Sequence, residues 1–297
     1  MGLNRPLVIV NPAAGRGRAV RVWEGLRHLE SRVECVTSEA PGHARHMALE
    51  ATRRGVDRVV AIGGDGTVSE VAGGLAGTDV ALGIVPAGTG NDFSRALGLP
   101  TTPEAAAQVA LDGSGRRVDL GEVHIGERCV AFVNVAGCGF DAEVVRRTRA
   151  APRMGGMVPY FIGIMRTLWA FRPRPMRFVV DGQPLERRAL GVAVANGHSY
   201  GGGMRIAPGA VIDDGLFDVC LIGDVSPVRL LALLPRLYAG THDGHPAVEF
   251  FTCRELRVDP MESANVCCQA DGELVGDLPA TFRIQPRGLL CVTGQSP

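Results

Sequence analysis

Acidic residues stand beside glycines at several points of this sequence where the main chain must turn. The clearest case is GGDGT (63–67), where an apolar run stops at two glycines and Asp65 lies between glycines. Bare backbone lets a ligand approach closely, and the N–H groups that open the next helix attract phosphate. A carboxylate beside phosphate repels it unless Mg²⁺ lies between them, or unless the carboxylate accepts hydrogen bonds from the loop's own N–H groups. Both roles of Asp65 remain open at this point.

Two similar loops follow other strand-like runs. The apolar runs of NRPLVIVN (4–11), DRVVAIGG (57–64) and DVALGIVPAG (79–88) each lead into a glycine-bearing turn and then a helical pattern. Repeated βα units indicate a parallel sheet with helices on its faces. Loops at the carboxyl ends of neighbouring parallel strands meet at one crevice, so the three loops should converge on one phosphate site. The chain contains no Walker A motif.

The GGDGT loop also predicts a helix start. Thr67 is followed three residues later by Glu70, the spacing of a capping box in which Thr67 would be the N-cap. We therefore expect the helix after GGDGT to begin at Thr67.

Beyond residue 120 the pattern changes to closely spaced strands separated by turn residues, which is typical of antiparallel β structure. We place a domain boundary near residue 122, giving an α/β domain over 1–122 and a β-rich domain over 123–297. The last strand can return to the first domain.

Composition narrows the possible partners. Thirty-one basic residues balance 31 acidic ones, so no global field attracts nucleic acid. The eight cysteines are scattered, which favours reduced core thiols and a cytoplasmic protein. The longest apolar segment (160–171) carries Arg166 and is too short to span a bilayer, so we expect a soluble chain that at most touches a membrane. The helical spacing of its apolar residues predicts a helix that packs in the core or, alternatively, one that lines the opening through which acyl chains enter.

The ordered motifs together resemble the diacylglycerol kinase catalytic-domain family, in particular its soluble bacterial lipid kinases, which are related to sphingosine kinases and more distantly to NAD kinase. GGDGT alone is shared with NAD kinases and 6-phosphofructokinases, whereas the two late blocks are more specific. The resemblance implies an α/β N-terminal domain with a parallel sheet, followed by a mainly antiparallel β-sandwich. It rests on NPAAG (11–15), TSEAPGHA (37–44), GGDGTVSE (63–70), PAGTGNDFSR (86–95), DDGLFDV (213–219) and DGE (271–273).

By similarity, the nucleotide would be held by backbone N–H groups and threonine hydroxyls, which bind phosphate oxygens without burying a side-chain charge. Ser69 departs from the family, where asparagine is usual, and this puts one hydrogen bond in doubt. The implied nucleotide residues are Asn11, Pro12, Ala13, Ala14, Gly15, Thr37, Gly64, Asp65, Gly66, Thr67, Val68, Ser69, Glu70 and Thr89.

The resemblance makes Glu273 the proton acceptor for the attacking hydroxyl, with Asp271 close enough to share or dispute that role. Without it, Asp271-Gly272 reads as a hairpin turn. DDGLFDV likewise reads first as a turn.

By resemblance, DDGLFDV is a structural Mg²⁺ site that uses the Asp214 carboxylate and the carbonyls of Val211 and Leu216, reached by Asp92 through water. A second, catalytic Mg²⁺ would arrive with ATP.

The sequence therefore predicts a Mg²⁺-dependent kinase that transfers the ATP γ-phosphate to a lipid hydroxyl, with diacylglycerol as the default acceptor and phosphatidic acid as product. A sphingoid-base or ceramide kinase shares every motif, and a nucleotide-binding regulator without catalysis is a further alternative. The late DDGL and DGE blocks argue against NAD kinase. We expect transient contact with the inner membrane surface, and a homodimer remains open.

Overall fold

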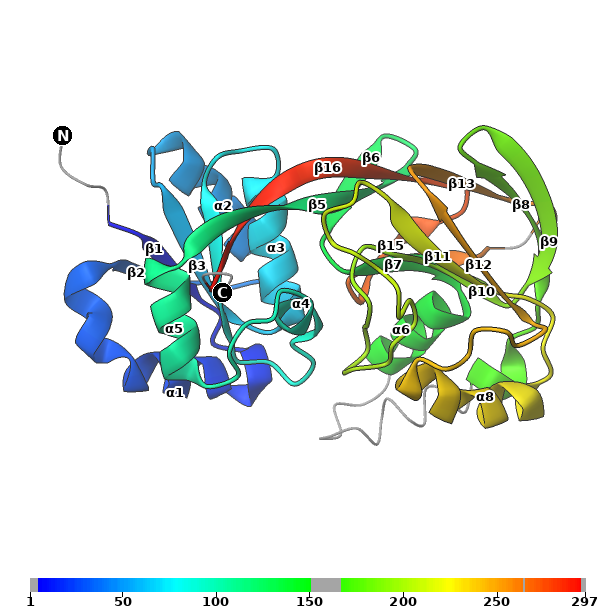
Figure 1. The fold of residues 1–297 in the computed structure, drawn as a ribbon, viewed down its shortest axis with the longest axis horizontal. Helices are drawn as coiled ribbons and strands as arrows, with labels where there is room; N and C mark the ends of the chain where they lie inside the picture. The colour runs from blue at the N-terminus through cyan, green and yellow to red at the C-terminus, as the bar shows by residue number, and fades with distance from the viewer. Residues whose placement is uncertain (1–4, 151–166, 264, 295–297) are drawn as a thin grey trace. The chain divides into compact units, whose positions relative to one another are not determined.

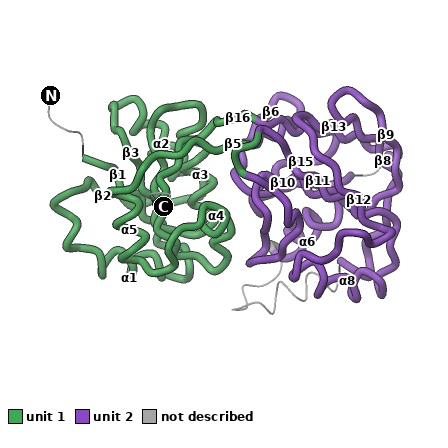
Figure 2. The backbone as a smooth tube through the Cα atoms, viewed as in Figure 1, with its two compact units in different colours: residues 1–120, 212–214, 285–297 green, residues 121–211, 215–284 purple. Residues whose placement is uncertain are grey.

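The computed structural model describes residues 5–150, 167–263 and 265–294. They form two compact units (Figures 1 and 2). The first unit comprises residues 1–120, 212–214 and 285–297, and the second comprises 121–211 and 215–284. Two long strands, β5 (Ser114–Ile125) and β16 (Ala280–Thr293), contribute residues to both units.

The first unit is an α/β domain. Its parallel strands lie in the order β2-β1-β3-β4, and β16 continues the sheet in parallel with β4, pairing Cys291 with Leu82. Every residue of β1 and of β4 is buried, as expected for strands covered on both faces. The elements are β1 (Leu7–Val10), a 3₁₀ turn η1 (Ala14–Arg16), α1 (Arg18–Gly25), η2 (Arg27–Arg32), β2 (Glu34–Thr37), α2 (His43–Arg53), β3 (Arg58–Gly63), α3 (Asp65–Leu75), β4 (Ala81–Pro86), α4 (Asp92–Ala96) and α5 (Pro103–Asp112).

The second unit is an antiparallel β-sandwich. One sheet has the order β12-β11-β10-β7-β14-β15, and the other is formed by β16, β13, β8 and β9 with β5 and β6. The elements are β6 (Arg128–Phe132), β7 (Val135–Gly139), α6 (Phe140–Ala150), β8 (Arg174–Val180), β9 (Gln183–Ala189), β10 (Gly191–Ala195), β11 (Phe217–Ile222), α8 (Pro227–Ala239), β12 (Val248–Cys253), β13 (Glu255–Pro260), β14 (Cys267–Ala270) and β15 (Glu273–Asp277). The α/β domain and the antiparallel sandwich confirm the fold class predicted from the sequence.

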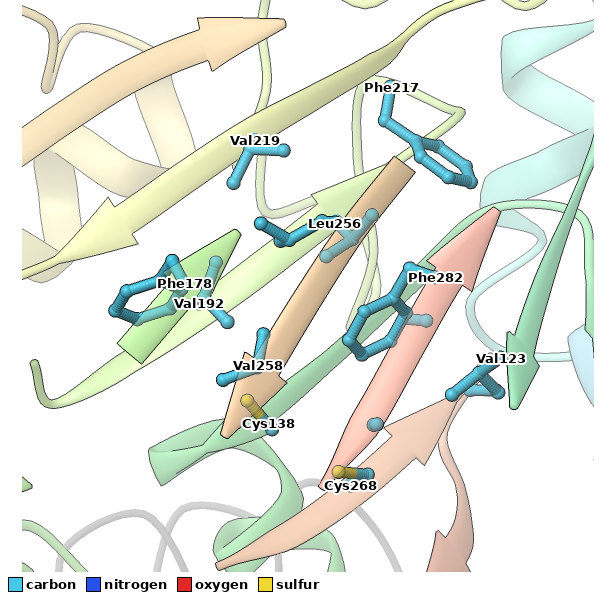
Figure 3. Close-up of a cluster of buried hydrophobic side chains, with 14 of the residues drawn as sticks. Val123, Cys138, Phe178, Val192, Phe217, Val219, Leu256, Val258, Cys268 and Phe282 are labelled. Carbon is cyan, nitrogen blue, oxygen red and sulfur yellow. The ribbon is translucent and has the colours of Figure 1, made fainter. Parts of the chain in front are cut away.

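The core between the two sheets of the sandwich is aliphatic and aromatic (Figure 3). Phe178, Leu256 and Phe282 come from one sheet, and Val192 and Phe217 come from the other. Alternate residues of β10 point to opposite faces, since Val192 and Val194 lie in this core whereas Ala193 and Ala195 lie in a second cluster. Leucines of α8 belong to that second cluster, so α8 covers the outer face of the six-stranded sheet.

Most of the apolar segment 160–171 lies outside the described residues. Of its end, Leu168 is buried with 3% exposure and Trp169 is 59% exposed. No helix in the described chain has the length and apolar character needed to cross a membrane. All eight cysteines are free thiols, five of them buried, although Cys129 is exposed.

Candidate functional site

The three glycine-bearing loops of the first unit meet at the carboxyl ends of β1, β3 and β4. Asn11, directly after β1, donates from Nδ2 to Thr67 Oγ1 at 2.9 Å. Ala87, directly after β4, donates its backbone N–H to the Gly63 carbonyl at 2.8 Å. The predicted convergence of the loops is therefore present in the structure.

Glycine is required where these loops touch. A Cβ added to Gly15, whose φ is +55°, would lie 2.2 Å from the Ala87 carbonyl oxygen. A Cβ on Gly88 would lie 2.5 Å from Gly64 Cα. Any side chain at Gly15 or Gly88 would push the loops apart, so the close contact of three backbones depends on these residues.

Asp65 orders the third loop. Its two carboxylate oxygens accept the backbone N–H groups of Asn91 and Asp92, each at 2.7 Å. Burial, together with the charge of Asp92, raises the pKa of Asp65, while the backbone hydrogen bonds oppose that rise. Of the two roles left open by the sequence, the structure supports the second, in which the carboxylate binds the loop's own amides.

The predicted capping box is wrong. Helix α3 begins at Asp65 with Gly64 as N-cap, because the two glycines let the chain pass directly from β3 into the helix, and Thr67 lies inside its first turn. Thr67 Oγ1 accepts from Asn11 instead.

Glu70 reaches a different helix. Its Oε1 accepts the backbone N–H of Gly42 at 2.9 Å and its Oε2 accepts that of Ala44 at 3.1 Å, at the start of α2. A carboxylate there satisfies orphan N–H groups and interacts favourably with the helix dipole. Glu70 thus joins α3 to α2, and its place among the nucleotide residues remains a prediction.

The other predicted nucleotide residues differ in exposure. Val68 is buried at 2% exposure, so only its backbone could contact a ligand. Ala14, Gly15, Gly64 and Ser69 are half-buried. The exposed members are Pro12, Ala13, Thr37, Gly66 and Thr89.

The predicted metal ligands are divided between the units. Asp92 and Asp214 belong to the first unit, whereas Val211 and Leu216 belong to the second, so the set remains a prediction. The Asp92 carboxylate is buried and forms an ion pair with Arg95. Asp214 is exposed in the turn before β11.

Asp119 was missed by the sequence reasoning. It is fully buried in β5, donates its backbone N–H to the Ile212 carbonyl at 2.7 Å, and accepts the Arg287 N–H on Oδ1 at 2.7 Å. It thereby ties the 212–214 segment and β16 to β5 within the first unit. The available signal was an acid inside the apolar strand pattern VDLGEV.

In the second unit, Asp271 and Gly272 form the two-residue loop between β14 and β15. Their φ angles are +46° and +80°, and Ala270 pairs with Glu273 across the hairpin, as in a type I′ turn. The Asp271 carboxylate accepts three backbone N–H groups, from Val133 at 2.8 Å, Asn134 at 3.0 Å and Val135 at 3.2 Å. Its own N–H donates to the Val135 carbonyl at 3.0 Å.

A second hairpin of the same unit repeats this arrangement. Asp181 and Gly182, with φ angles of +46° and +85°, join β8 to β9. The Asp181 carboxylate accepts the N–H groups of Arg254 and Glu255, and its N–H donates to the Glu255 carbonyl. The repetition indicates that Asp271 fastens a hairpin to a neighbouring strand. Glu273, exposed at the start of β15, is not needed for that fastening.

A chain of hydrogen bonds behind this hairpin, which passes through buried Gln269, was also missed. Gly272 N–H donates to Gln269 Oε1 at 2.8 Å, and Gln269 Nε2 donates to Asp141 Oδ2 at 2.9 Å. Asp141 Oδ1 accepts the Ala142 N–H at the start of α6. Burial raises the pKa of Asp141 to about 6, with these hydrogen bonds opposing the rise. Sequence spacing gives no signal for a contact between residues 141 and 269.

Comparison with known proteins assigns a class to this arrangement. The model of the diacylglycerol kinase catalytic domain matches residues 5–123. The model of the YegS C-terminal NAD kinase beta sandwich-like domain matches residues 134–293. The two matches cover both units and define the protein as a lipid kinase.

Individual relatives agree. A diacylglycerol kinase of Mycobacterium tuberculosis is 36% identical over 295 residues, covering 97% of this chain and 94% of that protein. One from Bacillus subtilis is 29% identical, covering 94% and 93%. The crystal structure of a diacylglycerol kinase from Bacillus anthracis shares the fold with a TM-score of 0.73 and 22% identity, covering 99% of this chain and 98% of that one. The chain belongs to the diacylglycerol kinase family, as its motifs predicted.

Proposed function

We propose that the protein transfers the γ-phosphate of ATP to the hydroxyl of a membrane lipid, with diacylglycerol as the acceptor and phosphatidic acid as the product. The observation that carries the proposal is the contact of three glycine-bearing loops, in a chain of the diacylglycerol kinase family, with the acid of GGDGT bound to amides of the neighbouring loop. Bare backbone at one sheet edge suits a polyphosphate.

The nucleotide would bind along these loops. Exposed backbone at Gly66 and Thr89 offers N–H groups to phosphate oxygens, whereas the Ala13 N–H donates to Asn11 Oδ1 and Asn11 Nδ2 donates to Thr67. The Asp65 carboxylate accepts two backbone N–H groups of the neighbouring loop. These donors partly neutralise its negative charge, which reduces its repulsion of phosphate.

The residues present fit Mg²⁺ in part. Asp214 and the carbonyls beside it are hard oxygen donors of the kind Mg²⁺ prefers. Asp92 is paired with Arg95, so its contact with a cation would be indirect. When bound, Mg²⁺ with ATP would neutralise charge that develops on the transferred phosphoryl group.

Glu273 is the proposed proton acceptor. The lipid hydroxyl oxygen attacks the γ-phosphorus, the bond from that phosphorus to the β–γ bridging oxygen breaks, and the hydroxyl proton passes to the Glu273 carboxylate. ADP leaves, and the proton is returned to water. Asp271 is assigned a positioning role. Its carboxylate oxygens accept three backbone N–H groups, and the turn that it forms leads directly into Glu273, the first residue of β15.

The test is phosphorylation of a mixed lipid extract by the purified chain with labelled ATP and Mg²⁺, followed by mass spectrometry of the labelled lipid. Labelled phosphatidic acid is expected. A labelled sphingoid base or ceramide phosphate would instead show that the acceptor is a sphingolipid, while the transfer of the γ-phosphate to a lipid hydroxyl would stand. Glu273→Gln should abolish labelling while ATP still binds. No labelled lipid from wild type under any condition would leave the nucleotide-binding regulator as the function.

A further inference from the structure

Helix α8 (Pro227–Ala239) is apolar on two opposite faces. Leu230, Leu233 and Leu237 are 2–3% exposed and pack in the cluster on the outer face of the six-stranded sheet. A surface helix of a globular protein normally carries charged and polar residues opposite such a face. This helix does not.

The outward face of α8 carries large apolar side chains. Val228 is 66% exposed, Leu231 40% and Tyr238 42%. Their spacings of three and seven residues place them on one side of the helix, and the other exposed residues on that side are Ala232, Pro235 and Ala239. Trp169, 59% exposed, follows Leu168, which packs in the same cluster as the α8 leucines.

Arginines border this face. Arg229 and Arg236, seven residues apart, lie along one side of the apolar stripe. Arg229 also lines a pocket of about 560 Å³ together with Arg187, Arg188 and His245. The pocket's acids, Asp224 and Glu249, form ion pairs with Arg188 and Arg187. Within the described chain Arg229 makes no ion pair, so three arginines face two acids and a positive charge remains at the edge of the stripe.

We propose that the outward face of α8, with the Arg229 pocket at its border, docks on an anionic phospholipid bilayer. Apolar side chains enter the boundary between headgroups and acyl chains, and Arg229 at its border binds lipid phosphate, whereas the Arg236 guanidinium donates to the carbonyls of Thr241 and Asp243. The inference rests on the proposed function to the extent that a kinase acting on a membrane lipid must reach a bilayer. A second copy of the chain fits less well, because a narrow stripe from one helix offers far less area than stable dimers bury.

The test is co-sedimentation of the full chain with vesicles. Wild type should bind vesicles of phosphatidylcholine with about 30% phosphatidylglycerol at least tenfold more tightly than pure phosphatidylcholine vesicles, and salt should weaken the binding. The double change Val228→Gln and Leu231→Gln should reduce binding about tenfold. Arg229→Gln should reduce it about fivefold, on anionic vesicles only.

Matched controls lie elsewhere in the same unit. Met261→Gln changes another half-exposed apolar side chain and Arg254→Gln another exposed arginine, and neither should change vesicle binding. All of these side chains point to solvent, so thermal unfolding should match wild type and exclude misfolding as the cause.

Two results would overturn the docking surface: equal vesicle binding by the α8 variants and wild type, or a wild-type dimer that the double variant converts to monomer without any effect of vesicles. Phosphorylation of a water-soluble short-chain diacylglycerol separates this proposal from the proposed kinase function. The α8 variants should retain wild-type rates on that acceptor. Vesicle binding without phosphorylation of any acceptor would instead reject the kinase proposal and retain the surface.

Discussion

Replacement of Asp271 by alanine should destabilise the second unit strongly. The carboxylate accepts three backbone N–H groups, and their residues Val133, Asn134 and Val135 are only 2%, 6% and 1% exposed. Water cannot easily replace the lost acceptor there. A buried donor left without a partner costs about 1–3 kcal/mol. Because three adjacent amides relax together, we expect the free energy of unfolding to fall by about 3–5 kcal/mol in total.

Asp181→Ala is the matched control. Asp181 has the same φ of +46°, so the strain of alanine in the left-handed region is common to both variants. Its carboxylate accepts only two N–H groups, and one of them belongs to exposed Arg254, which water can solvate. The expected loss for Asp181→Ala is therefore smaller, about 1–2 kcal/mol.

Urea unfolding of wild type and both variants measures the difference. The slope of free energy against urea should be unchanged, and the midpoint should fall further for Asp271→Ala than for Asp181→Ala. Equal or reversed losses would refute the fastening role. If Asp271→Asn folds normally but is inactive while Glu273→Gln remains active, the proton-acceptor role belongs to Asp271.

Three further predictions concern other residues. Glu70→Ala should lower the unfolding free energy by about 1 kcal/mol, because the N–H groups at the start of α2 lose their acceptor. Glu50→Ala, on the exposed side of α2, should not lower it. Equal urea midpoints for the two variants would contradict this role of Glu70. Gly88→Ala should cost about 1–3 kcal/mol and weaken ATP binding at least tenfold by calorimetry. Gly25→Ala, with open space around its Cβ in α1, should not lower stability and should leave ATP binding unchanged. The pKa of Asp141, raised to about 6, makes this group lower stability by about 3 kcal/mol as pH rises from about 4 to 6. Asp141→Asn should remove that fall from the pH profile of urea unfolding, and an unchanged slope would contradict it.

The sequence predicted what depends on local pattern. Aliphatic runs ending at Gly63 and Ala87 indicated parallel strands, and the rule that their carboxyl ends meet at one edge placed the loops together before any contact was known. The Asp-Gly pair at 271–272 also indicated a hairpin correctly. These features need only residues that are neighbours in the chain.

The roles of the acids could not be predicted in this way. Glu70 has the spacing of a capping partner for Thr67, yet it binds amides 26 and 28 residues earlier, because α2 and α3 lie side by side in the fold. The hydrogen bond between Gln269 and Asp141 joins residues 128 positions apart. The local sequence pattern around an acidic residue does not indicate which distant backbone N–H its carboxylate binds.

The acidic residues of the family motifs therefore differ in the groups that their carboxylates bind. Asp65, Glu70 and Asp271 each bind backbone amides of another segment, and Asp92 binds Arg95. Loss of activity on replacing any of these four would not by itself show a catalytic role, since each change also releases a loop, a helix start, a hairpin or an arginine. Glu273 is exposed at the start of β15, beside the hairpin that Asp271 fastens. At Glu273, as at the other acids, an isosteric change that abolishes phosphorylation therefore indicates a catalytic role only when unfolding is measured alongside and stability is unchanged.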